Sequence, residues 1–115
     1  MKYNINIKDN NIVCHLLDGA GEVAVKAAKR LDKAKDEDNS VAYYVMKFKE
    51  AEAIYASLDY LWHKNHHASL KSYAGDDPVS KAELAVSKAE VAREKAKFDL
   101  AVLEAEKAEK AWLDA

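Results

Sequence analysis

VSKAELA (residues 79–85) is followed directly by VSKAEVA (86–92), a repeat with one change at its sixth position. Seven residues make two helical turns, so such a repeat keeps the same side chains on the same face of a helix. The register continues to the end of the chain in two columns, Leu84, Val91, Phe98, Ala105 and Trp112 in one, and Ala82, Ala89, Ala96 and Leu103 in the other. This pattern predicts a helix over 78–114.

A second long helix is predicted over 40–72. Its apolar residues recur at alternating spacings of three and four: Val41, Tyr44, Phe48, Ala51, Tyr55, Leu58 and Trp62. This spacing is typical of a seam that packs against another helix. The acidic residues at 36–38 precede it, where they favour the positive end of a helix.

The connection between the two predicted helices is short. Gly75 supplies a stop, and Asp77 followed by Pro78 suits the start of a helix, although Ser80 with Glu83 offers an alternative capping box one turn later. Short connections join antiparallel neighbours, so the sequence predicts a long helical hairpin. Its fold places bulky side chains opposite small ones, namely Tyr55, Leu58 and Trp62 opposite Ala85, Ala89, Ala92 and Ala96, and it brings Ala51 and Ala53 near Leu100, Val102 and Leu103.

The N-terminal third carries a different pattern. Residues 2–8 alternate between polar and apolar, residues 9–11 suit a turn, and residues 12–17 form a second apolar run, so a β-hairpin over 1–17 is expected. After a glycine-containing break at 18–21, the spacing predicts a short helix over 22–35. The expected fold is therefore a mainly α, single domain over 1–115 with a small N-terminal β-hairpin, one short helix and a long antiparallel helical hairpin or coiled coil.

Composition narrows the function classes. The formal net charge of −2 supplies no general attraction to nucleic acid or to an anionic membrane. No apolar run is long enough to span a bilayer and no signal peptide opens the sequence, so a cytoplasmic protein is expected. Cys14 is the single cysteine and is expected to be a reduced, half-buried thiol. No phosphate loop, paired-cysteine motif or nucleophile elbow is present, so neither enzymatic activity nor a cofactor is expected.

Three histidines form the most suggestive chemical cluster. His63, His66 and His67 are close in sequence, and Asp59 lies one helical turn before His63. Imidazoles and a carboxylate are zinc ligands, but the Glu of the His-Glu-x-x-His pattern is missing. The favoured interpretation is solvated surface histidines, with no metal, and the alternative is that His63, His66 and His67 are metal ligands.

A short basic stripe lies in the predicted short helix and consists of Lys26, Lys29, Arg30 and Lys33. Such a stripe suits contact with phosphates. It has no interleaved aromatic residues and three acidic residues follow it, so a solvated helix face is favoured and binding of nucleic acid is not expected.

The last third of the predicted helix over 78–114 is more apolar than one neighbouring helix requires. A helix over 78–114 is about 55 Å long, which exceeds the size of a compact domain of this length. The side chains expected to associate with a partner or a second copy are Phe98, Leu103, Trp112 and Leu113. We therefore expect a homodimeric, non-enzymatic protein-binding module of the inhibitor or adaptor type, such as phages and mobile elements encode against host proteins; the alternatives are a nucleic-acid-associated accessory protein and a metal-binding helical dimer.

Overall fold

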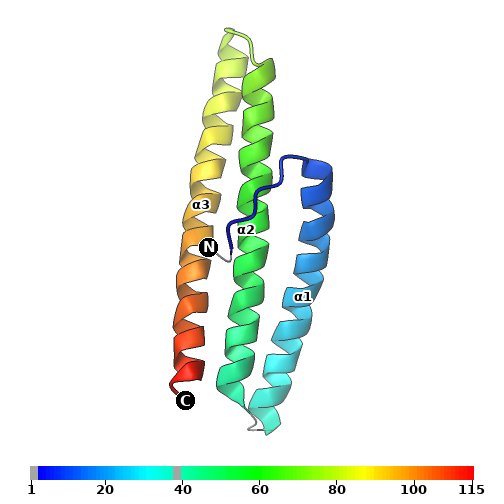
Figure 1. Cartoon of the computed structure of the whole chain (residues 1–115). Coiled ribbons are helices and arrows are strands. Elements are labelled where there is room, and N and C mark those ends of the chain that lie inside the picture. The colour runs from blue at the N-terminus through cyan, green and yellow to red at the C-terminus, as the bar shows by residue number, and fades with distance from the viewer. Residues whose placement is uncertain (1–2, 38–39) are drawn as a thin grey trace.

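The chain folds into three antiparallel helices, α1 (Asn10–Glu37), α2 (Val41–Tyr73) and α3 (Pro78–Leu113). This computed structural model describes residues 3–37 and 40–115. α2 lies in the middle, with α1 on one side and α3 on the other (Figure 1). Within the described residues, α1 and α3 each pack on α2 and do not approach each other closely. The molecule is therefore an elongated, open arrangement of three helices, 59 × 24 × 23 Å, rather than a closed bundle.

The predicted helical hairpin is confirmed. The Asp77 side chain caps α3, because its Oδ2 accepts a hydrogen bond of 3.0 Å from the Ser80 N–H and its Oδ1 accepts one of 2.7 Å from the Ser80 hydroxyl. Pro78 occupies the first turn, where a missing N–H costs nothing. At the other side of the connection, the Ala74 N–H donates to the Leu70 carbonyl and closes α2.

The predicted N-terminal β-hairpin is wrong: residues 3–37 and 40–115 contain no strand. Residues 4–9 are extended and cross α2 (Figure 1), with Tyr3 buried, Ile5 and Ile7 half-buried and the intervening side chains exposed. The alternation thus marks the buried face of an extended segment that lies on helices. Side chains satisfy its polar groups, since Asn65 Nδ2 donates to the Ile7 carbonyl at 2.7 Å and Asn10 Nδ2 donates to the Trp62 carbonyl at 3.1 Å.

The second predicted strand, residues 12–17, is the start of α1. A short apolar run suits a strand or a buried helix equally, and here Asp9 decides for the helix, because its side chain accepts a hydrogen bond of 2.9 Å from the Asn11 N–H. Val13 is fully buried, whereas Cys14 is exposed rather than half-buried. The predicted break at 18–21 is also wrong, so the short helix over 22–35 is the C-terminal part of one longer helix. Two helical glycines cost about 1 kcal/mol each relative to alanine, which the packing of α1 on α2 offsets.

The seam of α3 differs from the prediction in one of its two columns. The column that runs through Leu84, Val91, Phe98 and Ala105 is half-buried or buried, as expected, but its last predicted member, Trp112, is exposed. The predicted second column, Ala82, Ala89, Ala96 and Leu103, is exposed, and so are Ala85 and Ala92. The true second column is Ser87, Glu94, Ala101 and Ala108. The predicted packing of bulky α2 side chains on the alanines at 85–96 is therefore wrong, and these alanines form the outer face of the helix.

The core lies where the N-terminal segment meets the hairpin. Tyr3, Ala53, Val102 and Ala105 form a buried cluster, and Phe98 packs against it. The Phe98 ring also stacks on Tyr60 at a centroid distance of 5.8 Å. The expected proximity of Ala53 to Val102 is confirmed. Leu103, expected in the same contact, is exposed.

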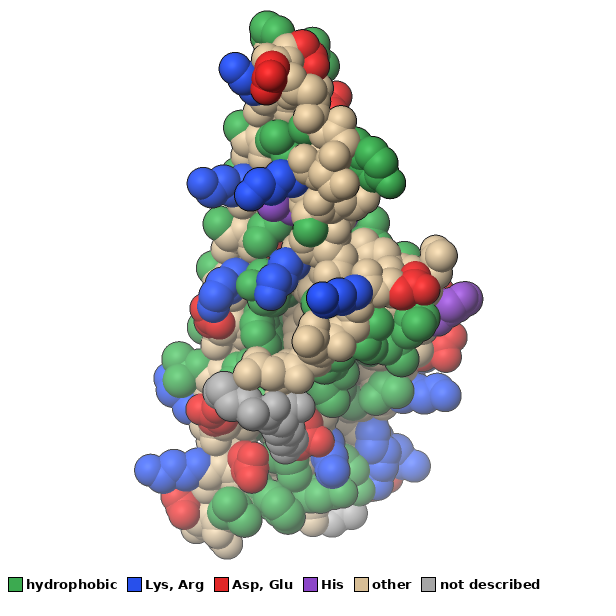
Figure 2. Space-filling view, turned by 45° about the horizontal axis from the view of Figure 1, so that its top comes forward, with side chains coloured by type: hydrophobic (Ala, Val, Ile, Leu, Met, Phe, Trp, Pro, Cys, Tyr) green, Lys and Arg blue, Asp and Glu red, His purple; other side chains and the backbone are tan. Residues whose placement is uncertain are grey.

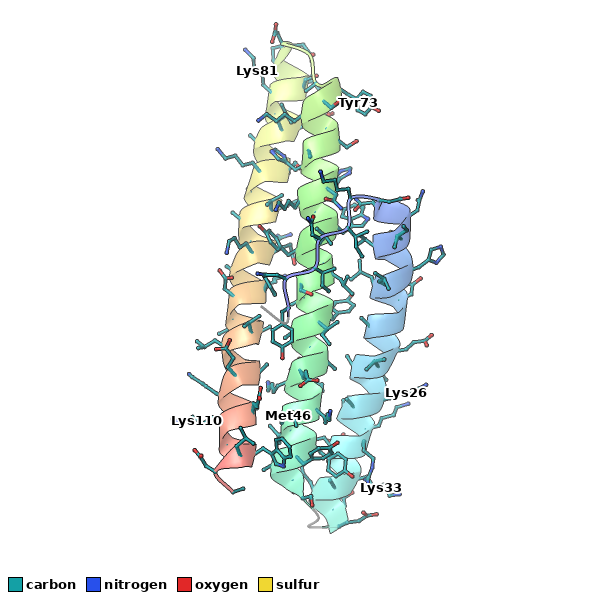
Figure 3. The ribbon with its side chains drawn as sticks, viewed as in Figure 1. Lys26, Lys33, Met46, Tyr73, Lys81 and Lys110 are labelled. Carbon is teal, nitrogen blue, oxygen red and sulfur yellow. The ribbon has the colours of Figure 1, made fainter. Side chains whose placement is uncertain are left out.

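The end of the hairpin projects beyond the first turn of α1 (Figure 1). Tyr73 and Lys81 mark this region, where Tyr73 points away from α3 (Figure 3). Figure 2 shows one face of the molecule, on which charged side chains of both signs are interspersed with hydrophobic ones. None of the helices in the described part of the chain combines the length and hydropathy needed to cross a bilayer.

Candidate functional site

An open cavity of about 710 Å³ lies along α2 between α1 and α3, and we call it the central groove. α1 contributes small side chains. α2 contributes aromatic and acidic side chains, and α3 contributes aliphatic and acidic ones. The lining residues are Gly21, Ala24, Val25, Ala28, Phe48, Glu52, Tyr55, Ala56, Asp59, Glu94, Lys97, Leu100, Ala101 and Glu104. The α2 positions that face the N-terminal segment, such as Ser57 and Leu61, lie on the other side of the helix. The groove is therefore on the opposite face from the core formed with Tyr3.

The charge lining the groove is predominantly negative. Four carboxylates line it, Glu52, Asp59, Glu94 and Glu104, against the single basic residue Lys97. At one end of the groove, Lys49 Nζ lies 3.3 Å from Glu52 Oε1 and 3.2 Å from Glu104 Oε2, so this side chain links α2 to α3. Burial lowers the pKa of Lys49, but the hydrogen bond to Glu104 and the charge of Glu52 outweigh it and raise the pKa overall.

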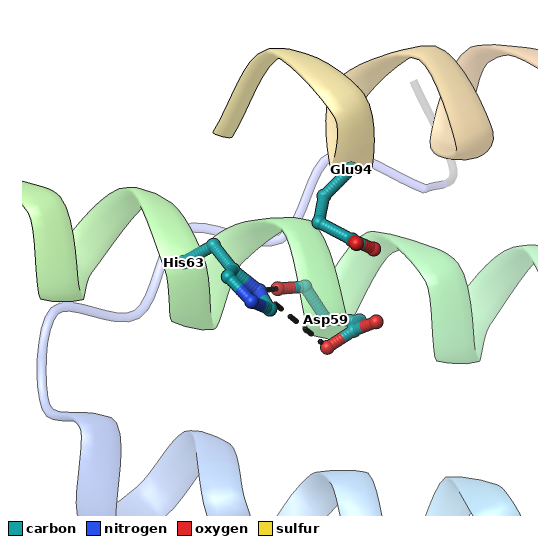
Figure 4. A group of neighbouring side chains, drawn as sticks. All are labelled: Asp59, His63 and Glu94. Carbon is teal, nitrogen blue, oxygen red and sulfur yellow. Dashed lines mark hydrogen bonds and ion pairs between the residues drawn. The ribbon is translucent and has the colours of Figure 1, made fainter. Parts of the chain in front are cut away.

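Asp59, His63 and Glu94 form a cluster at the other end of the groove (Figure 4). Asp59 and His63 are one turn apart on α2, and Glu94 comes from α3. One side-chain nitrogen or oxygen atom from each residue lies within 4.8 Å of the others. His63 Nδ1 is 2.9 Å from the Asp59 backbone carbonyl and 3.6 Å from Asp59 Oδ1. Since a carbonyl only accepts, this hydrogen bond places a proton on Nδ1.

Glu94 is the most buried member of the cluster, with 5% of its surface exposed. Its Oε1 contacts Lys97 Nζ at 3.4 Å and Arg93 Nε at 3.5 Å. Burial raises the pKa of Glu94, but the interaction with Asp59 and the Lys97 charge lower it overall. Burial, followed by the interaction with the Glu94 carboxylate, raises the pKa of Asp59, and the charges of His63 and Lys97 oppose that shift. Asp59 is thus the member of the pair that holds a proton more readily.

The three histidines named from the sequence do not face one common point. His63 contacts Asp59 and meets the Trp62 ring edge-on at 5.1 Å, and the His66 ring stacks on Trp62 at 4.9 Å. His67 Nδ1 shares a hydrogen bond of 3.0 Å with the Ser87 hydroxyl. The ligand group that the structure brings together contains Glu94 instead of the other two histidines. Sequence reasoning missed Glu94 because it lies among lysines, although it sits seven residues after Ser87 in the seven-residue register.

The predicted basic stripe is divided by the fold. Lys26 and Lys33 point away from α2 (Figure 3), and Lys29 is also exposed. Arg30 instead turns toward α2, where its guanidinium donates a 2.9 Å hydrogen bond to the Tyr44 hydroxyl and lies 4.4 Å from that ring's centroid. Lys33 forms an exposed ion pair of 3.8 Å with Glu37. The outward charge of the stripe is therefore carried by lysines alone.

The four predicted association residues fall in different environments. Phe98 lies inside the fold against Tyr60, and Trp112 meets the Tyr43 ring edge-on at 5.5 Å. Leu103 and Leu113 remain 48% and 67% exposed. Leu103 and Leu113 are therefore the two candidates that remain available to another molecule.

No family model, no curated protein and no solved structure matches the chain.

Proposed function

We propose that this protein is a non-enzymatic binding module that holds an amphipathic helix of another protein in the central groove. The observation that carries the proposal is the open arrangement of the helices, in which α1 and α3 flank α2 without approaching each other in the described residues. A helix lying on α2 between them completes a four-helix arrangement, a common way for helices to bury an apolar face.

The lining of the groove suits a helix. Gly21, Ala24 and Ala28 recur at spacings of three and four on α1, and Ala101 lies opposite them on α3. Small side chains let two helix backbones approach closely. Tyr55 and Leu100 are exposed in the groove and offer apolar surface to an occupant. The length from Phe48 to Asp59 is about 17 Å, which corresponds to roughly three turns of a bound helix.

Charge selects the kind of helix. The excess of carboxylates over the one lysine favours an occupant with basic residues beside its apolar face. Complementary charges of this kind direct association and orientation more than they add affinity. We therefore expect a partner segment of about three turns, with leucine or similar residues on one face and lysine or arginine on its borders.

A synthetic probe tests the proposal. The probe is a sixteen-residue amphipathic peptide of leucine, alanine and lysine, and its matched control replaces every lysine by glutamate. We expect the lysine peptide to shift the amide resonances of Gly21, Ala24 and Ala101, and the glutamate peptide to leave them unchanged. Ala24→Arg should abolish the shifts by filling the groove, whereas Ala92→Arg, on the exposed face of α3, should not. Shifts that persist in Ala24→Arg, or that fall outside the groove, would contradict the proposal.

A further inference from the structure

We propose that Asp59, His63 and Glu94 form a binding site for a divalent transition-metal ion such as Zn²⁺. The inference rests on side chains that two helices bring together, independently of any helix bound in the groove. It replaces the three-histidine cluster suggested by the sequence with one histidine and two carboxylates.

The placement of the three side chains suits one ion. Residues one turn apart on a helix present their side chains on the same face, which places Asp59 and His63 as neighbouring ligands from α2. Glu94 supplies a third ligand from α3. Ligand atoms around a tetrahedral zinc ion are ~3.4 Å apart, given metal–ligand distances near ~2.1 Å. The three atoms already lie within 4.8 Å of one another, so small side-chain rotations bring them to an ion.

The types of ligand atom indicate the class of metal. One imidazole nitrogen with two carboxylate oxygens suits zinc and other first-row transition metals, whereas magnesium and calcium favour oxygen ligands alone. His63 Nδ1 lies 3.6 Å from Asp59 Oδ1, and it is the metal ligand when the ring exchanges its hydrogen bond to the Asp59 carbonyl for the ion and carries its proton on Nε2.

The surrounding charges set the affinity. Without a metal, the paired carboxyl groups of Asp59 and Glu94 are compensated by Lys97 and Arg93, and both of these bases contact Glu94 through Oε1. The Lys97 and Arg93 side chains are 62% and 63% exposed, so each turns into solvent at small cost when a metal ion arrives. Lys97 therefore competes with a metal ion for the Glu94 carboxylate. Its replacement by glutamine should therefore tighten metal binding.

Three protein ligands leave at least one coordination position for another group. Asp59 and Glu94 both line the central groove, so this position opens toward the groove. A water molecule or a side chain of a bound segment completes the coordination there. The site is thus connected to the proposed binding surface, although His63 itself does not line it.

Cobalt provides the direct test, because tetrahedral Co²⁺ absorbs strongly in the visible range and six-coordinate aqueous Co²⁺ does not. We expect the full chain to bind one Co²⁺ with this absorption, Zn²⁺ to displace it, and Zn²⁺ to raise Tm by several degrees. His63→Ala and Glu94→Gln should each weaken binding at least tenfold, and Lys97→Gln should strengthen it. The matched controls are His66→Ala and His15→Ala, which remove histidines outside the cluster and should bind as the unaltered protein does.

Circular dichroism of each variant separates loss of the site from loss of the fold. A variant that keeps its helical signal but no longer binds Co²⁺ supports the proposal. Equal loss of binding in His66→Ala or His15→Ala would overturn it, as would undiminished binding in a folded His63→Ala or Glu94→Gln. Failure of the unaltered chain to bind Co²⁺ or Zn²⁺ at 100 µM would overturn it as well. The peptide titration described above measures binding in the groove in the absence of metal, so either proposal can be contradicted while the other stands.

Discussion

Glu94 on α3 lies opposite Asp59 on α2, and the two carboxyl groups shift each other's pKa in opposite directions at the end of the central groove. The buried Glu94 keeps its charge because Lys97 and Asp59 stabilise the anion, whereas Asp59 holds its proton to higher pH than usual. A half-buried carboxyl group with a raised pKa is destabilising when it is ionised. The pair is therefore expected to link the stability of the α2–α3 contact to pH.

Replacement of Asp59 by asparagine measures this link. A raised pKa means that the contribution of Asp59 to stability is fully present below its unfolded-state value, near 3.8, and is lost as pH rises through the folded-state value. Because asparagine does not titrate, the substitution Asp59→Asn should raise the free energy of unfolding of the metal-free protein, relative to the unaltered protein, more at pH 7 than at pH 4. Since Asp59 is partly solvated, the expected gain is only a few tenths of a kcal/mol to about 1 kcal/mol.

Urea unfolding at pH 4 and pH 7, with a chelator present, checks the Asp59 prediction. Asp32→Asn is the matched control, because Asp32 is an exposed aspartate of α1 with no role in the pair. A destabilised Asp59→Asn at pH 7, or the same pH dependence in both variants, would show that the carboxyl pair does not govern this linkage.

Two alanines of α3 test the assignment of its buried face. Ala105 is buried against Tyr3, Ala53 and Val102, while Ala96 is exposed. Ala105→Lys places a long charged side chain in a packed cluster and should cost about 3 kcal/mol or more. Ala96→Lys should change the free energy of unfolding by no more than about 0.5 kcal/mol. Urea unfolding compares them, and similar costs at both positions would mean that the buried face of α3 is assigned wrongly.

Ser87 should contribute to stability through its hydrogen bond to His67. Ser87 is buried and shares a 3.0 Å hydrogen bond with His67 Nδ1, so Ser87→Ala leaves the imidazole nitrogen without that partner. The expected cost is about 0.5–1.5 kcal/mol. Ser69→Ala, at an exposed position of α2, is the control and should be neutral. Thermal unfolding followed by circular dichroism compares the two, and an undiminished Tm in Ser87→Ala would argue against a stabilising role.

The same serine explains why the sequence predicts only part of the seam. The seven-residue period and the Leu84, Val91, Phe98 and Ala105 column follow from apolar side chains, and the structure agrees with both. The second column contains Ser87 and Glu94, which are buried because α2 offers polar partners to them. A pattern of apolar residues does not reveal such positions, since the partner is far away in the sequence. The candidate site was missed for the same physical reason.

The N-terminal segment shows a different limit of sequence reasoning. The alternation at residues 3–8 identifies correctly which side chains face inward, but an extended segment with one buried side need not pair with a strand. Its carbonyl at Ile7 accepts a hydrogen bond from Asn65, some sixty residues later in the chain. The competing signal for a helix from residue 10 was local, namely the side chain of Asp9 at its start.

Leu103 and Leu113 carry the prediction of a homodimer. Together with Glu106 and Lys110 they recur at spacings of three and four, so the four side chains share the face of α3 turned away from α2. Two exposed leucines with one acidic and one basic residue between them can pair with the same face of a second, antiparallel copy, as a two-fold interface requires. We expect sedimentation equilibrium to find a dimer at tens of micromolar and Leu103→Glu to yield a folded monomer. Ala68→Glu, at an exposed position of α2 and therefore outside this face of α3, should remain dimeric, and a dimer that survives Leu103→Glu would place the association elsewhere.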